Sequence, residues 1–169
     1  DGIVDWETVM IGLRQADGPA AEKKRLRGLR EWLQSLGPAT AVPEIRRFLD
    51  SGENTSLAQR FRVGPGGKLV GAPSLRSTLL DWLGRWNPEA AATIGRDELT
   101  SAGTALPPSE YVLHLRNVAW ASAGDRPRGS DRTFLLTHTR ALLRHDPWMR
   151  DPTAAVAEAM DVVVYLEAV

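Results

Sequence analysis

The sequence contains no cysteine, which excludes thiolate catalysis, disulfide bonds and zinc sites that use cysteine ligands. It also has no apolar run long enough to cross a bilayer as a helix. An excess of charge of one sign is missing too, because 21 basic residues balance 21 acidic ones. The chain therefore has no overall field that would draw it onto nucleic acid or an anionic lipid surface, and any anion site must be a local patch.

Signatures of catalysis are also absent, since the sequence has no nucleophile elbow, no His-Glu-x-x-His motif and no dinucleotide fingerprint. Residues 64–68 fail as a phosphate-binding loop, because Arg62 stands where the first glycine is needed and Leu69 where a hydroxyl is needed. His138 and His145 lie seven residues apart, about 10.5 Å along a helix, which is too far to share one metal ion. We therefore expect no enzyme activity, catalytic residue, metal or cofactor.

Apolar residues recur at helical spacing along most of the chain, interrupted by residue pairs that end one helix and start the next. Four leucines between residues 26 and 36, for example, form one face of a segment that Gly37 and Pro38 end. The pattern predicts helices that begin near Ile3, Pro19, Pro43, Ser74, Pro88, Pro108, Asp131 and Asp151. The predicted fold class is all-α, a single domain of stacked antiparallel helix pairs over residues 1–169.

One stretch does not follow the helical pattern. Residues 60–63 and 68–70 alternate in polarity and flank the glycine-rich turn 64–67, as in a β-hairpin. We predict that residues 51–73 are an inserted segment whose hairpin protrudes and leans on a helix through Phe61 or Leu69. On this interpretation the insert can be removed without opening the core.

The chain also repeats itself at a spacing of fifty residues. Residues 29–41 align with residues 79–91, and five of the thirteen pairs are identical. The match pairs Trp32 with Trp82 and Pro38 with Pro88, so that an amphipathic helix, a stop and a proline restart recur in register. We interpret this as an internal repeat and expect both tryptophans in the core.

Residues 33–50 contain this stop and run to an acidic turn at Asp50, and they resemble the second half of a HEAT repeat. The resemblance is strongest over residues 20–100. It implies an α-solenoid of helix pairs, and it implies that Asp50 meets an arginine early in the following helix, for which Arg76 is the matching residue. The family usually has only a few residues where this chain inserts 51–73.

Two basic loops are the candidate binding surfaces. The hairpin would present a basic and aromatic edge that can receive a peptide strand or an anion, and a second basic loop precedes the helix at Asp131. The candidate binding residues in these loops are Arg60, Phe61, Arg62, Lys68, Arg126 and Arg128. A basic helix face is interpreted as ordinary solvated surface, and it carries Lys23, Lys24, Arg27 and Arg30.

These features favour a non-catalytic binding or scaffolding module that recognises a protein or peptide partner through a helical face or the hairpin. Two alternatives stay open: a nucleic-acid-acting protein similar to the HEAT-like DNA glycosylases, and a structural segment of a larger envelope protein. Because the chain begins at Asp1 rather than Met, we also expect a mature or excised portion of an exported or anchored protein, with a cytoplasmic location as the alternative.

Overall fold

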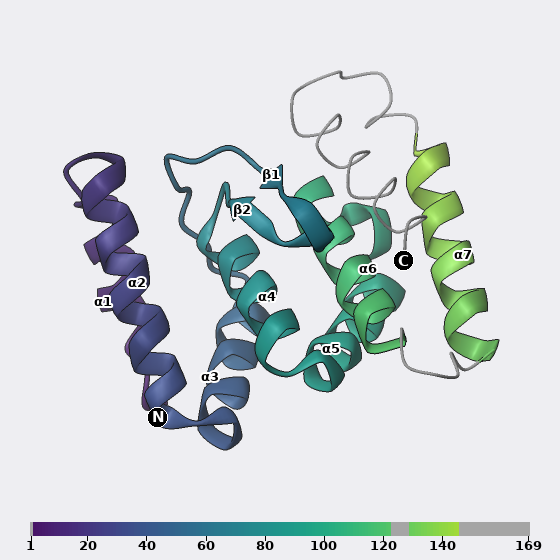
Figure 1. The fold of residues 1–169 in the computed structure, drawn as a ribbon, viewed down its shortest axis with the longest axis horizontal. Coiled ribbons are helices and arrows are strands. Elements are labelled where there is room, and N and C mark those ends of the chain that lie inside the picture. The colour runs from purple at the N-terminus through teal and green to yellow at the C-terminus, as the bar shows by residue number, and fades with distance from the viewer. Residues whose placement is uncertain (1, 123–128, 146–169) are drawn as a thin grey trace.

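The computed structural model describes residues 2–122 and 129–145, which form seven α-helices and one two-stranded antiparallel sheet. The predicted fold class, mostly helical with a small β-hairpin, is confirmed. The helices are α1 (Trp6–Arg14), α2 (Gly18–Leu36), α3 (Pro38–Asp50), α4 (Leu75–Trp86), α5 (Pro88–Ser101), α6 (Pro108–Ser122) and α7 (Gly129–Arg144). The strands β1 (Arg62–Val63) and β2 (Leu69–Gly71) are joined by a short 3-10 turn, Pro65–Gly67. Figure 1 shows the helices in a row from α1 and α2 at one end to α7 at the other.

Local sequence sets where the helices begin and end. The Asp5 carboxylate accepts a hydrogen bond from the Thr8 N–H at the start of α1, and the Asn87 side chain accepts one from the Ala90 N–H at the start of α5, both at 3.1 Å. Gly37 separates α2 from α3 with a φ of 73°, a value that favours glycine. The helix stops predicted at Gly37 and Asn87 are therefore confirmed.

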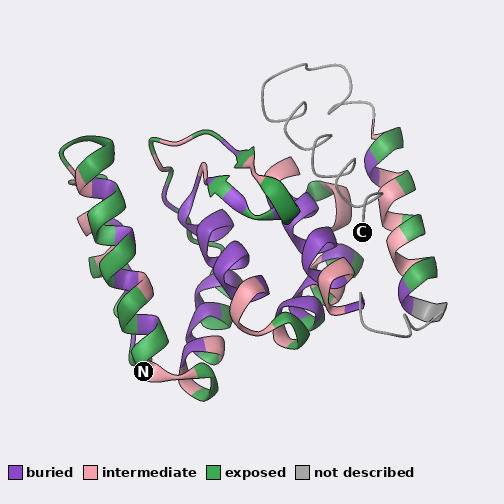
Figure 2. Ribbon diagram, viewed as in Figure 1, coloured by how far each residue is buried: buried purple, intermediate pink, exposed green. Residues whose placement is uncertain are grey.

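The core is centred on α4 and α6, which carry most of the fully buried side chains, whereas α1, α2 and α7 keep one face exposed (Figure 2). A close approach joins these two central helices. The Asn117 amide of α6 donates to the Leu80 carbonyl of α4 at 3.1 Å, and a Cβ at Gly84 would overlap the Asn117 side chain. A glycine at position 84 is therefore needed for α6 to pack at this distance.

Some predicted helix boundaries are wrong. The third helix begins at Pro38, and Pro43 lies inside it, because Gly37 already supplies the turn and Pro38 suits the first helical position. The first helix begins at Trp6, and Ile3 is 61% exposed rather than part of the buried stripe. The helix predicted from Asp131 is α7, whereas the helix predicted from Asp151 lies outside the described residues.

The expected pair between Asp50 and Arg76 is also wrong. Arg76 is buried, and its guanidinium donates to the Leu49 carbonyl at 2.7 Å and to the Glu110 carboxylate at 2.9 Å. Asp50 instead lies 3.7 Å from Arg46, one turn earlier on the same helix. Arg76 thus caps the end of α3 through the backbone and links α3, α4 and α6.

The repeated tryptophans differ in burial. Trp82 is 8% exposed and stacks on Trp86 with 5.7 Å between the ring centroids. Trp32 is 38% exposed, so its predicted place in the core is wrong. Trp32 instead lies at a hollow between α1 and α2, which Thr8, Val9 and Gly12 also line. Within residues 2–122 and 129–145, no helix combines the length and apolarity needed to cross a bilayer.

Candidate functional site

The predicted hairpin is present, but it is packed into the molecule. Phe61 is 2% exposed and Leu69 is 9% exposed, and both belong to the hydrophobic core. Gly66 and Gly67 have φ values of 72° and 71°, which allow the tight turn between the strands. The predicted lean on a helix through Phe61 or Leu69 is confirmed, whereas a protruding hairpin is wrong, because its apolar side chains fill the core. That the insert can be removed without opening the core stays a prediction.

A buried network of charged side chains holds the hairpin against α4 and α6. The Asp81 carboxylate of α4 lies 2.7 Å from the Arg116 guanidinium of α6 and 2.6 Å from the Arg85 guanidinium. It also accepts a hydrogen bond from the Leu69 N–H at 3.1 Å. Arg116 donates to the Gly67 carbonyl at 3.0 Å. Strand β2 and the turn before it are therefore tied to the two central helices by charge-assisted hydrogen bonds.

Arg116 is the most constrained cation of this network. Its side chain is 2% exposed, and its guanidinium stacks over the Trp120 ring at 4.0 Å from the centroid and donates to Asn117 at 2.9 Å. Burial lowers the pKa of Arg116, and the neighbouring Asp81 counteracts this. The Asp81 carboxylate, at 2.7 Å, offsets the buried charge of Arg116.

This network also closes the outer edge of β2. Arg85 donates to the Leu69 carbonyl at 2.9 Å, while Asp81 receives the Leu69 N–H. Both backbone groups that a further strand would use at Leu69 are thus occupied by side chains of α4. An incoming peptide cannot pair with β2 at this residue, which disfavours the predicted addition of a peptide strand at this edge.

The structure separates the sequence-predicted binding residues. Arg60, Arg62 and Lys68 are exposed, as a binding edge requires. Phe61 is buried and cannot present its ring to a partner, because it fills the core beneath the strands. The remaining two candidates, Arg126 and Arg128, lie outside the described residues.

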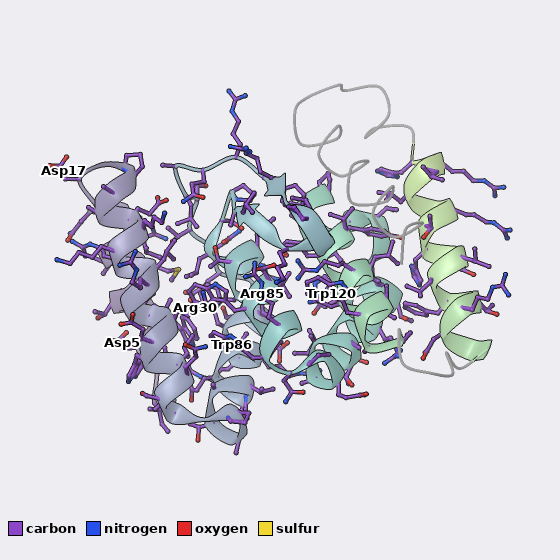
Figure 3. All side chains as sticks on the ribbon, in the orientation of Figure 1. Asp5, Asp17, Arg30, Arg85, Trp86 and Trp120 are labelled. Atoms are coloured by element: carbon purple, nitrogen blue, oxygen red, sulfur yellow. The ribbon has the colours of Figure 1, made fainter. Side chains whose placement is uncertain are left out.

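A groove runs between α2 and the hairpin, and we call it the basic groove. Its first part is a hollow of about 350 Å³ lined from α2 by Lys23, Arg27 and Arg30 and from α4 by Asp81 and Trp82. The three cations are spaced so that they share one face of α2. The Arg30 side chain extends into the space between α2 and α4 (Figure 3), and its Nε is buried without a hydrogen-bond partner among the described residues.

The second part of the basic groove is a hollow of about 580 Å³ that adds Arg60 and Arg62. The two hollows adjoin, because Lys23, Val70 and Gly71 line both of them. Their surface combines five cations with apolar side chains of the hairpin and α4. The five cations are Lys23, Arg27, Arg30, Arg60 and Arg62, and none of them forms an ion pair with another described residue. The acidic lining residue, Asp81, is already paired with Arg85 and Arg116.

The sequence interpretation missed the α2 side of this groove. Lys23, Arg27 and Arg30 were expected to form ordinary solvated surface. Their spacing on one helix face was a visible signal, but that face meets the hairpin only in the folded chain. The structure thus brings this face together with Arg60 and Arg62, which lie thirty or more residues away.

The described histidines do not form a site with this groove. His114 is 1% exposed, neither of its ring nitrogens has a hydrogen-bond partner among the described residues, and burial and then Arg76 lower its pKa to about 3. The Tyr111 hydroxyl donates to the His138 carbonyl at 2.7 Å, and burial lowers the pKa of His138. In the part of the chain that the structure describes, no three His, Asp or Glu side chains gather as metal ligands.

Comparisons with protein-family models, with curated proteins and with solved structures each give no match for this chain. The resemblance to HEAT repeats therefore stays a prediction. Function has to be inferred from the groove itself.

Proposed function

We propose that this domain is a non-catalytic binding module that holds an acidic segment of a protein partner in the basic groove. The observation that carries the proposal is the set of five groove cations without an ion-pair partner among the described residues. Such cations are free to form charge-assisted hydrogen bonds with carboxylates, and arginine does so in a bidentate way.

The mixed lining favours a peptide over a nucleic acid. Leu26, Leu57, Val70 and Trp82 lie among the cations, and apolar surface of this kind suits the side chains of a peptide. The chain has no net charge at neutral pH, whereas binding to a phosphate backbone is usually supported by an overall basic surface. Helix pairs of the kind found in HEAT repeats would support the same scaffold role.

The test is a titration of the protein into a short fluorescent peptide rich in Asp and Glu, followed by anisotropy. Arg27→Glu with Arg30→Glu should weaken binding about tenfold or more, equivalent to about 1.4 kcal/mol, because both cations line the groove. The matched control is Arg140→Glu with Arg144→Glu, two exposed cations on α7 that undergo the same change of charge.

Equal losses in the two double variants would mean that net charge alone governs binding, and the groove proposal would be rejected. A parallel titration with random duplex DNA separates the alternative. If DNA binds more tightly than the peptide and with a steep dependence on salt, the nucleic-acid function becomes the leading interpretation.

A further inference from the structure

A third hollow lies further along α2 and α4, past the Arg30 end of the basic groove. It measures about 270 Å³ and is lined by Leu33 and Gln34 from α2, by Val42 and Ile45 from α3, and by Trp86 from α4. In contrast to the basic groove, this hollow contains no charged side chain in its lining. It therefore suits an apolar group.

Helical spacing shows that the third hollow is in line with the first. Arg27, Arg30 and Gln34 follow one another at intervals of three and four residues, so they share one face of α2. On α4, Trp82 lines the first hollow and Trp86 the third, one turn further along.

The Trp86 ring forms part of the wall of this third hollow. Its stack on Trp82, at 5.7 Å between centroids, holds the ring in place. A fixed aromatic wall of this kind offers a large apolar contact area to an inserted side chain.

We infer that the acidic segment bound in the basic groove carries an apolar anchor residue, which inserts into the third hollow against the Trp86 ring. From Lys23 to Gln34 the α2 helix rises about 16 Å, which an extended peptide covers in about five residues. The recognised motif is thus a cluster of carboxylates with an aliphatic or aromatic side chain about four to six residues away. This inference rests on the proposed function.

The test compares three labelled peptides of equal charge. One carries a leucine about five residues before the acidic cluster, one carries it about five residues after, and the third has serine in its place. In one of the two orders, leucine should strengthen binding about tenfold over serine, since burying an apolar side chain of this size is worth at least that factor.

Two variants of the protein locate this gain. Val42→Phe should abolish the gain by filling the hollow from α3, and Trp86→Phe should reduce it several-fold because a smaller ring replaces the indole wall. Both variants should keep the affinity for the serine peptide, and unchanged helical circular dichroism confirms that they are folded. A second readout is the emission of Trp86, obtained by subtracting the spectrum of Trp86→Phe, which should shift only with the leucine peptide.

The outcomes separate the two proposals. If all three peptides bind equally well in every variant, the anchor is refuted and the acidic-segment function stands. If no peptide binds, both are refuted. A gain from leucine that Val42→Phe leaves intact would also overturn the inference, because the anchor would then lie elsewhere.

Discussion

Replacing Asp81 by alanine should be among the most damaging single changes in this domain. Its carboxylate is 4% exposed and neutralises Arg116, which is 2% exposed. Removing one partner of a buried pair leaves an uncompensated charge, and this costs about 3 to 5 kcal/mol. The Leu69 N–H would lose its acceptor at the same time.

The loss in the free energy of unfolding is measured by urea denaturation, followed by circular dichroism. The matched control is Asp97→Ala, which removes another carboxylate from an arginine, here Arg46 at 3.1 Å with side chains 57% and 45% exposed. Solvent screens that pair, so its loss should cost less than about 1 kcal/mol. Replacing the buried pair as a whole, with Asp81→Leu and Arg116→Met, should recover part of the loss because the fully buried charge of Arg116 is removed with its partner, and Arg85, which also loses Asp81, is 26% exposed.

Amide hydrogen exchange gives a local readout of the same change. In Asp81→Ala, the Leu69 amide and its neighbours in the hairpin should exchange faster than the amides of α5. A cost of less than about 1 kcal/mol for Asp81→Ala, similar to the control, would show that the network does not hold the hairpin.

The other predictions concern packing and pH. Trp82→Ala should lower the free energy of unfolding by about 3 to 5 kcal/mol, and Trp32→Ala should lower it by clearly less. Thermal melting of the two variants compares these losses, and similar losses would contradict the difference in burial. Gly84→Ala should destabilise the domain by about 1 to 3 kcal/mol, because the added methyl group meets Asn117 of α6. Gly28→Ala, with open space around it, should be neutral or stabilise the domain by up to about 1 kcal/mol. The opposite order of stabilities in urea unfolding would refute the close approach of α4 and α6. Burial lowers the pKa of His114 from 6.5 to about 3, so the unfolded chain binds a proton that the folded chain does not. The free energy of unfolding should therefore fall by about 1.4 kcal/mol per pH unit as the pH decreases from about 6 to 3, relative to His114→Phe, and equal pH slopes would contradict this.

The sequence predicted most of the elements because their signals are local. Asn87 and the glycine at position 37 end and restart helices by their own conformational preferences, and the alternation around residues 64–67 indicates the hairpin. Partners could not be predicted in the same way. The contact of Arg76 with Glu110 and the Leu49 carbonyl depends on where α6 and the end of α3 lie in space, not on the acidic turn next to it in the alignment.

The basic groove also could not be predicted from the sequence, because it is formed by segments that meet only in the folded chain. The alternating pattern over residues 60–63 predicted a strand, which the structure confirms only at Arg62–Val63, and one sequence cannot show which face of a strand meets a core. The cations of α2 have an obvious shared face, yet a solvated face and the wall of a groove have the same composition. Only the packing of the hairpin against α4 distinguishes them.

The most direct test of the central claim is to map where an acidic peptide binds. Isotope-labelled protein is titrated with the Asp- and Glu-rich peptide, and backbone and arginine side-chain NMR shifts are followed. The proposed function predicts that the largest changes lie at Lys23, Arg27, Arg30 and Gly71, including the Arg30 Nε–H, and that salt reverses them. Changes that cluster on another surface, or no saturable changes at low salt, would contradict it.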